Sequence, residues 1–254
     1  MQRKVLAEYK YELKPIVRGY NKRTLYVNVG DKVIKEKPVT DMMIDKFVGG
    51  KGFDLYLMWH GVNDNTKWND PENEICIAFG PLCGNTSYPG SGKSIVTTIS
   101  PLTGIPVDCN VGGHFGPYTK FAGFDALELQ GKADEDVIVF IDGDKGIVQI
   151  LSAPDKVINS HILAEELHKE FAGSEEHLQH VSVVSSGSAS DHVLITCLNF
   201  SFWDKRRKVA RLKQAGRGGT GTVFRDKSIK ALVVKYSGLS VDKNDPADLP
   251  TLQK

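Results

Sequence analysis

Hydrophobic residues recur along the chain in short runs, many of them alternating with polar residues, which is the pattern of β-strands. The runs are rich in β-branched and aromatic side chains, which favour extended backbone. They predict strands at residues 24–29, 75–79, 94–99, 126–130, 181–184, 192–200 and 229–236. The turn residues Gly30-Asp31 and Asp142-Gly143 predict two hairpins, formed by residues 24–36 and 137–151.

Helical patterns are fewer, and most of them are short. Each predicted helix has a capping residue before it or a glycine after it. The three are residues 42–48 (cap Thr40 or Asp41), 53–60 (stop at Gly61) and the amphipathic 161–171 (cap Asn159 or Ser160, stop at Gly173). The basic segment Asp204–Gln214 is expected to be a helix or an arm.

Strands outnumber helices, and the alternation of strand and helix that builds parallel sheets is weak. The sequence therefore predicts an α+β fold, a β-rich domain of mostly antiparallel sheets with a few short helices. The domain is expected over residues 18–237. Residues 1–17 are expected to be an arm lying on a neighbour or on the domain itself, and residues 238–254 a C-terminal tail or linker.

Composition narrows the functional classes. The 254 residues carry a formal charge of only +1, so the net charge does not attract the chain to nucleic acid or to an anionic membrane. No apolar run approaches the length of a transmembrane helix, and the charged N-terminus lacks the apolar core of a signal peptide. A cytoplasmic location is expected. The four cysteines form no CxxC pair, which argues against a zinc or iron–sulfur motif.

Two glycine-rich stretches stand out. The first, Pro89–Gly123, contains Lys93 and Asn110, and the second, Gly216–Gly221, follows Lys213 and contains Arg217. Backbone amides in such loops, with a cation on each, suit an extended polyanion whose phosphates lie on the main chain. The arginine can contact two phosphate oxygens, and the amide oxygen of Asn110 suits a hard cation such as Mg²⁺. The alternative is that both stretches are tight turns and bulges of a β-rich domain.

Three short motifs suggest a nucleotide or metal site, but the residues around them do not support that interpretation. Gly92-Lys93-Ser94 suggests a nucleotide-binding P-loop, but the β-branched residues after the lysine favour a strand where a P-loop needs a helix. Gly216-x-Gly218-x-x-Gly221 suggests dinucleotide binding, but a basic segment precedes it and a strand is expected to follow. The histidines His177-x-x-His180 and His161/His168 lie among glutamates, and a solvated charged face explains them as well as a metal site does.

The order of several segments resembles a known family. Residues 80–133 (GPLCGNTSYPGSGKSIVTTISPLTGIPVDCNVGGHFGPYTKFAGFDALELQGKA) contain PLTG, GGHFGP, KFAGFD and GKA, and AGRGG follows downstream at residues 215–219. Together they resemble the N-terminal domain of the tungsten-containing aldehyde ferredoxin oxidoreductases. The resemblance covers about residues 18–237, as a separate subunit or a truncated chain.

In that family the domain is a β-rich base that binds two pterins coordinating one tungsten, or molybdenum. The resemblance implies that Asn110 helps to bind the magnesium that bridges the two pterin phosphates, and that Gln214 binds through its main chain. The positions that it implies as cofactor contacts are Lys93, Asn110, Gly112, Gly113, Lys213, Gln214, Gly216, Arg217, Gly218 and Gly219.

The chain departs from the family pattern at three cations. Lys51, Lys93 and Lys213 stand where the family usually has arginine, and lysine keeps the charge but loses the bidentate contact. None of the four cysteines matches a ligand of the family's [4Fe–4S] cluster. The cluster, further pterin contacts and the substrate pocket are expected on C-terminal helical domains or a partner chain.

The resemblance implies the cofactor-binding part of an enzyme of anaerobic metabolism that oxidises aldehydes to carboxylic acids. Electrons would pass to the iron–sulfur cluster and then to ferredoxin or a similar carrier. Catalytic residues are not identified. His114 is a weak candidate for moving protons, and a hydrogen-bonded structural histidine is the stronger interpretation. Two alternatives are a non-catalytic scaffold or electron-transfer subunit that kept the fold, and a subunit of a related acyl-CoA-reducing complex.

Overall fold

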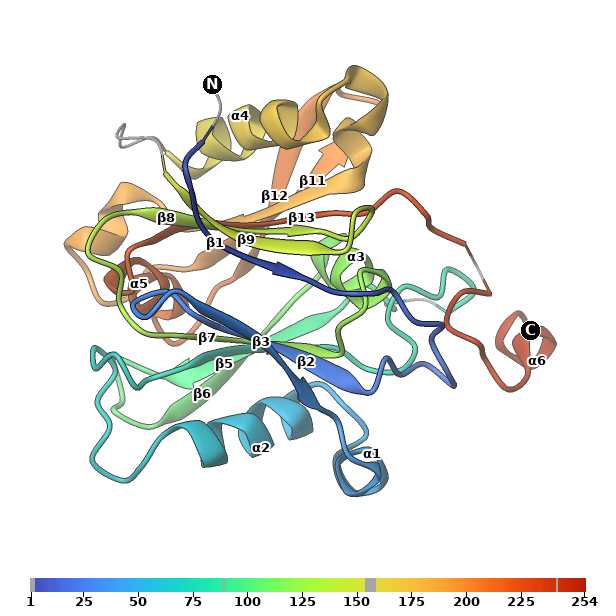
Figure 1. Ribbon diagram of the computed structural model, residues 1–254, viewed down its shortest axis with the longest axis horizontal. Helices are drawn as coiled ribbons and strands as arrows, with labels where there is room; N and C mark the ends of the chain where they lie inside the picture. Colours follow the sequence, from blue (N-terminus) through green and yellow to red (C-terminus); the bar gives the residue numbers. More distant parts are fainter. Residues whose placement is uncertain (1–2, 89, 154–158, 241) are drawn as a thin grey trace.

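The computed structural model describes residues 3–88, 90–153, 159–240 and 242–254 (Figure 1). Several positions discussed above lie outside the described residues. They are residues 1–2 of the expected arm, Pro89 at the start of the first glycine-rich stretch, and Val241 in the expected tail.

Two β-sheets stacked face to face form the body of the molecule (Figure 1). The seven-stranded sheet has the order β1 (Val5–Lys10), β9 (Ile147–Ser152), β8 (Val137–Asp142), β13 (Ile229–Lys235), β10 (Val181–Ser185), β11 (Leu198–Asp204) and β12 (Val209–Ala215). The six-stranded sheet has the order β3 (Val33–Pro38), β2 (Arg23–Asn28), β7 (Ala126–Gln130), β4 (Ile75–Ala78), β5 (Ser94–Ile99) and β6 (Pro106–Val111). The pairs β2–β7 and β8–β13 are parallel and the remaining named pairs are antiparallel, which confirms the predicted fold class.

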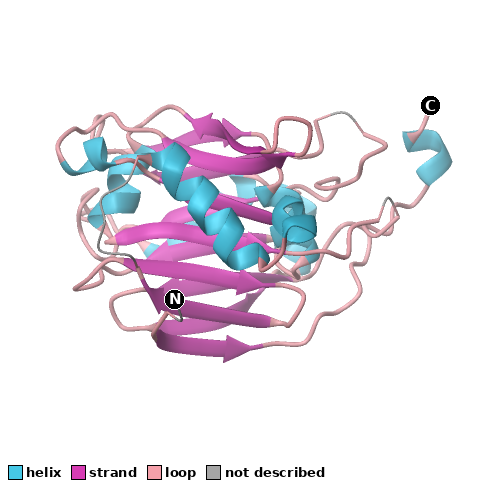
Figure 2. Ribbon diagram, turned by 90° about the horizontal axis from the view of Figure 1, so that it is seen from above, coloured by secondary structure: helices cyan, strands magenta, loops and turns pink. Residues whose placement is uncertain are grey.

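Helices cover the outer faces of both sheets and insert between them. The helix α4 (Ser160–Ala172) lies across the seven-stranded sheet, as Figure 2 shows from above. The other helical segments are α1 (Asp41–Phe47) and α2 (Lys51–Gly61) on the six-stranded sheet, α3 (Phe115–Phe121) and α5 (Thr220–Asp226) beside the core, α6 (Leu249–Leu252), and the 3₁₀ turns η1 (Glu175–His180) and η2 (Ser188–Asp191). No helix of the described residues is long and apolar enough to cross a membrane.

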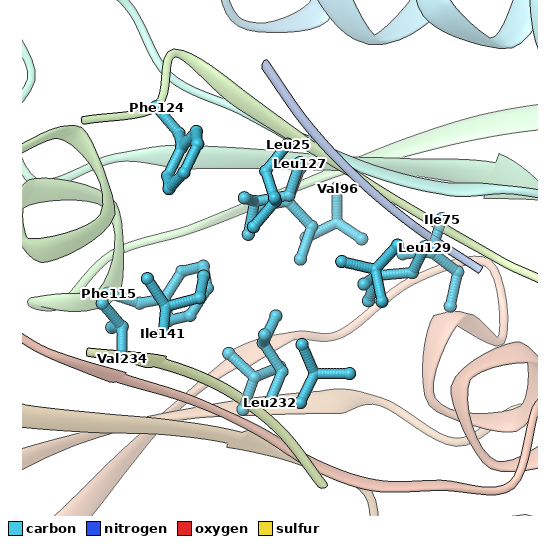
Figure 3. Packing of buried hydrophobic residues seen from close by; sticks show 14 of the residues in the cluster. Leu25, Ile75, Val96, Phe115, Phe124, Leu127, Leu129, Ile141, Leu232 and Val234 are labelled. Atoms are coloured by element: carbon cyan, nitrogen blue, oxygen red, sulfur yellow. The ribbon is translucent and has the colours of Figure 1, made fainter. Parts of the chain in front are cut away.

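The main hydrophobic core lies between the two sheets (Figure 3). Leu127 and Val96 of the six-stranded sheet face the seven-stranded sheet, which contributes Ile141 and Leu232. Smaller clusters lie under α4 and under α2. Because α2 covers the outer face, β7 is buried on both faces, including Glu128, whereas its alternation had predicted a half-buried strand.

The edges of the two sheets meet on both sides of the molecule. Strand β1 lies beside β3, and β6 lies beside β12. Both glycine-rich stretches are attached to the second pair of edges, because Gly112 follows β6 and Gly216 follows β12. The fold therefore brings the two stretches to one seam, which we call the β6–β12 seam.

Local signals in the sequence placed several elements correctly. The Oγ1 atom of Thr40 accepts a hydrogen bond from the Met43 amide at 3.2 Å, and Asn159 caps α4. Gly173 adopts the left-handed conformation that ends this helix (φ 77°). Both predicted hairpins form, as β2–β3 and β8–β9.

Other predictions were wrong or incomplete. The basic segment 204–214 is not a helix or an arm, because β12 pairs with β11 along its whole length. Residues 192–197 precede β11 rather than belonging to a strand. Strand β6 and helix α3 had been taken as part of a glycine-rich loop. The expected arm contains β1, which pairs with β9.

Candidate functional site

The β6–β12 seam joins the two glycine-rich stretches by direct packing. A Cβ atom added at Gly218 would lie 2.4 Å from Cγ2 of Val107 on β6. One added at Gly113 would lie 4.0 Å from Cγ of Lys213 on β12. Residues about a hundred positions apart in sequence therefore form one site.

The hairpin of β5 and β6 positions the first stretch. Ile95 lies opposite Asn110 in this antiparallel pair, so Lys93 and Gly112 come together at its end. The Nζ atom of Lys93 would lie 3.9 Å from a Cβ atom at Gly112. The backbone of Gly92 lies so close to Gly113 that a Cβ atom there would be 2.7 Å from the Gly113 carbonyl oxygen.

The alternation of β6 sends its side chains to opposite faces of the sheet. Cys109 and Val111 are buried in the main core, whereas Asp108 and Asn110 lie on the face covered by α2. The carboxylate of Asp108 pairs with Nζ of Lys51, the first residue of α2, at 2.6 Å. Asn110 is exposed, so its amide oxygen is accessible at the edge of the sheet.

The two neighbouring residues of β12 also face opposite ways. Lys213 lies opposite Phe200 of the main core, and its Nζ atom is 6.0 Å from the ring centre of Phe202. The side chain of Gln214 turns to the other face, where Nε2 donates to Oδ1 of Asn199 at 3.4 Å. Gln214 therefore offers the seam its main chain rather than its side chain.

His114 lies between β6 and α3, beside the seam. Its Nδ1 atom is 3.1 Å from the hydroxyl of Tyr118, and its ring centre is 5.4 Å from that of Phe202. Tyr118 in turn donates to the carbonyl oxygen of Gln179. Burial beside these rings lowers the pKa of His114, so the imidazole is neutral at pH 7. These contacts are those of a hydrogen-bonded structural histidine.

Two glycines of the site are not explained by the conformation or packing of the chain. Gly113, Gly218 and Gly219 have φ values of 119°, 72° and 68°, a region that favours glycine. Gly112 and Gly216 have no positive φ. A Cβ atom at Gly216 would meet no atom of the described residues within 4 Å, and one at Gly112 would meet only the Lys93 side chain. The space beside Gly112 and Gly216 is open, so a ligand could approach their backbone closely.

The cations of the seam suit an anionic ligand. Lys93, Lys213 and Arg217 are exposed, and none of them forms an ion pair with a described residue, whereas Lys51 is paired with Asp108. Among the described residues, no group of three histidine, cysteine, aspartate or glutamate side chains could hold a metal ion. A magnesium ion here would depend on amide and main-chain oxygens and on ligand phosphates, which are hard ligands of the kind it prefers.

The structure shows which elements surround the two nucleotide-binding motifs. Ser94 begins β5, so a strand follows Lys93, as predicted, where a P-loop needs a helix. The context given for Gly216–Gly221 was wrong, because β12 precedes the glycines and α5 follows them. The topology still differs from a dinucleotide-binding unit. Strands β12 and β13 are not neighbours, since β10 and β11 lie between them.

Comparison with known proteins identifies the family. The family model described as "Aldehyde ferredoxin oxidoreductase, N-terminal domain" matches residues 24–236. This chain belongs to the aldehyde ferredoxin oxidoreductase family. The resemblance found in the sequence is thereby confirmed.

Several oxidoreductases are similar to this aldehyde ferredoxin oxidoreductase domain. The tungsten-containing aldehyde ferredoxin oxidoreductase of Pyrococcus horikoshii is 35% identical over 224 residues, which are 85% of this chain and 33% of the relative. That of Pyrococcus furiosus is 33% identical with the same coverage. The aliphatic sulfonate oxidoreductase, WOR-like subunit, of Pyrococcus furiosus is 29% identical over 87% of this chain and 35% of the relative. The chain spans about a third of the length of these relatives.

A solved structure shares the fold. It is the active site complex BamBC of benzoyl coenzyme A reductase in complex with 1,5-dienoyl-CoA. The TM-score is 0.73 at 27% identity, and the match covers 86% of this chain and 31% of the other. The aldehyde ferredoxin oxidoreductase N-terminal-domain fold is thus supported by both sequence and structure.

Parts of the seam were not found in the sequence. Strand β6 carries Val107, Cys109 and Val111 at alternate positions, a signal obscured by the surrounding glycines and prolines. The contact between Phe202 and Lys213 depends on the register of β11 against β12, and Lys51 and Asp108 lie far apart in sequence, so neither contact was visible before the fold.

Proposed function

We propose that this chain is the cofactor-binding domain or subunit of a tungsten bis-pterin oxidoreductase that oxidises aldehydes to carboxylic acids. The observation that carries the proposal is the convergence of two cation-bearing glycine stretches on one seam, with open space against Gly112 and Gly216. Relatives named as tungsten-containing enzymes support the same cofactor class.

The residues of the seam divide into three roles. Lys93, Lys213 and Arg217 would bind the phosphates of the two pterins, the lysines as point charges and the arginine with two parallel hydrogen bonds. The amide oxygen of Asn110 and the main-chain oxygen of Gln214 would bind a magnesium ion that compensates the charge of those phosphates. The five glycines would allow the cofactor to lie directly on the backbone, and they are Gly112, Gly113, Gly216, Gly218 and Gly219.

The cofactor would supply the two-electron redox chemistry, with tungsten or molybdenum as its metal. An aldehyde hydrate loses two electrons and two protons when it becomes a carboxylic acid. The electrons would leave through a [4Fe–4S] cluster, bound by the remainder of the enzyme, to ferredoxin or a similar carrier. This chain would contribute by binding and orienting the cofactor and by compensating the negative charge of its phosphates.

A second candidate has its own support. The fold matches a subunit of a benzoyl coenzyme A reductase complex, so the same base could serve a complex that reduces an acyl-CoA. Lysine at positions 51, 93 and 213 motivates a third candidate, a scaffold or electron-transfer subunit that does not hold the cofactor. The three candidates share the fold and differ in what the complete assembly contains and converts.

The decisive experiment uses the complete native assembly that contains this chain. Tungsten and molybdenum are measured by mass spectrometry, and pterin by the fluorescence of its oxidised derivative. Viologen-linked oxidation of a panel of aldehydes is then compared with viologen-linked reduction of acyl-CoA esters. Metal, pterin and aldehyde oxidation together support the proposal. Metal with acyl-CoA reduction alone supports the second candidate, and the absence of metal and pterin supports the scaffold.

A further inference from the structure

The hairpin of β11 and β12 ends in a concentrated positive charge. Its turn, Lys205–Lys208 (the basic turn), consists of four exposed cations. Residues 204–214 contain six basic residues and a single acidic one, Asp204, in a chain whose net charge is only +1. The charge of the chain is therefore unevenly distributed, and this hairpin carries the excess.

Hydrogen bonds hold the basic turn in one conformation. The carboxylate of Asp204 accepts from the amides of Arg206 and Arg207, each at 3.0 Å, and its carbonyl oxygen accepts from the Lys208 amide at 2.7 Å. Below the turn, the ring centre of Trp203 lies 5.8 Å from that of His168 on α4. Because the backbone of the turn is fixed in this way, binding there would cost little backbone conformational entropy.

Neighbouring acidic groups offset only part of this charge. Arg207 and Arg211 share Asp204, at 3.0 and 3.6 Å. Lys205 and Lys208 line a groove together with side chains of α4 and η1. The acidic residues of that groove are Glu165, Glu175 and Glu176, and it also contains Lys169. The basic residues of the hairpin still outnumber the acidic groups around them.

The basic turn leads directly to the proposed cofactor site. Strand β12 begins after it and continues through Lys213 to the glycines Gly216–Gly219. Lys213 lies five positions after Lys208 along extended chain, a span of roughly 16 Å. A protein bound at the turn would therefore lie close to the seam without covering it.

We propose that the basic turn is a docking surface for an acidic protein electron carrier, an inference that rests on the proposed redox function. Carriers of this kind bind through small, short-lived interfaces in which opposite charges speed and orient the encounter. An acidic protein fits better than a nucleic acid. Four cations on one tight turn offer neither a recognition helix for a groove nor a track of aromatic side chains for unstacked bases.

The test is a kinetic comparison in the complete enzyme. The quadruple variant K205Q/R206Q/R207Q/K208Q removes the charge, and K10Q/K14Q/K46Q/K145Q removes the same charge from exposed lysines elsewhere. The electron acceptors are a strongly acidic bacterial ferredoxin and the small dye benzyl viologen. We expect the KM for the ferredoxin at low salt to rise roughly tenfold in the turn variant only, and this difference to shrink at high salt. Turnover with the dye should be unchanged.

A double variant separates charge from folding. K205Q/R206Q keeps the Arg207–Asp204 ion pair, so the turn retains its conformation, and we expect an intermediate rise in KM. Equal KM values for the turn and control variants would overturn the inference, as would an effect that does not depend on salt. A third outcome would also overturn the inference. In it, the wild type binds a DNA duplex or phosphatidylserine vesicles in a salt-sensitive way, and the turn variant loses this binding while its ferredoxin kinetics stay normal. If dye-linked turnover fails in the wild type, the proposed function itself fails, and the docking inference fails with it.

Discussion

The side chain of Val107 occupies the space that a Cβ atom at Gly218 would need, so glycine at this position lets the edges of the two sheets come together. Gly219 is constrained in the same way, since a Cβ atom there would lie 2.2 Å from the carbonyl oxygen of Leu194. Gly112 and Gly216 are under no such constraint from the described residues. Four of the five glycines of the seam therefore fall into two pairs: Gly218 and Gly219 are required by packing, and Gly112 and Gly216 are free to receive a ligand.

Alanine substitutions should separate these two pairs. Gly218→Ala combines a left-handed φ with overlap against Val107, and we expect it to lower the free energy of unfolding by about 1–3 kcal/mol. Gly216→Ala should change it by no more than about 0.5 kcal/mol, but should reduce the tungsten and pterin content of the assembly. Urea denaturation and metal analysis measure the two effects. Equal destabilisation by both substitutions would contradict this division.

Asn110→Ala should lower the cofactor content and leave the domain folded. The side chain is exposed at the edge of β6, so its loss creates no cavity, but it removes the amide oxygen proposed to bind magnesium. Magnesium, tungsten and pterin are measured per assembly, with circular dichroism as the test of folding. Asn65→Ala, at an exposed asparagine in a loop, is the control. Normal metal content in the Asn110 variant would remove this residue from the site.

Charge and geometry at Lys213 can be tested by two substitutions. Lys213→Met removes the charge while keeping a long side chain over Phe202, so we expect it to retain the cofactor less well than the wild type, most clearly at low salt, where the charge is least screened. Lys213→Arg supplies the bidentate contact usual in the family and should retain the cofactor at least as well as the wild type. The pterin that remains after gel filtration at two salt concentrations is the measurement. Identical retention in the methionine variant would exclude a phosphate contact here.

Glu74 should make stability depend on pH. Burial, together with the charge of Glu128, raises the pKa of Glu74 from 4.5 to about 7, although Lys37 and Lys227 oppose the shift. The folded state therefore holds this proton more tightly than the unfolded state. The resulting stabilisation is complete below pH 4.5 and is lost as the pH rises to about 7. Its full size is roughly 3 kcal/mol.

Glu74→Gln should remove this dependence, because glutamine imitates the protonated carboxyl group. Denaturation curves at pH 5, 6, 7 and 8 give the measurement. Relative to the variant, the wild type should lose stability between pH 5 and about pH 7 and level off toward pH 8. Parallel pH profiles for the two proteins would show that Glu74 does not titrate as its environment implies.

The sequence predicted elements that depend on local signals. The cap at Asn159, the stop at Gly173 and the turn at Asp142-Gly143 are short-range features, and the fold contains each of them. The segment 204–214 misled because its charges suggested a solvated helix. In the fold its residues from Val209 onward belong to the edge strand β12, and Val209, Arg211 and Lys213 are exposed on one face, a two-residue period already present in the sequence.

The glycine-rich stretches and the family resemblance named the candidate site residues, but neither predicted how these residues come together. Lys93 and Asn110 could be named by their motifs, but their proximity to Lys213 depends on the contact between β6 and β12, which belong to different sheets. The pattern of hydrophobic and polar residues along the chain does not predict a contact between two different sheets. The sequence also did not predict on which face of the sheet the Gln214 side chain lies. That face follows from the register of β12 with β11, in which Gln214 pairs with Asn199.

The meeting of sheet edges on both sides has a consequence for how the domain behaves in the cell. Free edges are where strands of other molecules add, leading to aggregation and domain swapping. Here β1 lies beside β3 and β6 beside β12, so each edge is shielded by the other sheet. The two sheets thus protect each other's edge strands against strand addition. Other polypeptides would join it through loops, turns and helices rather than by extending a sheet.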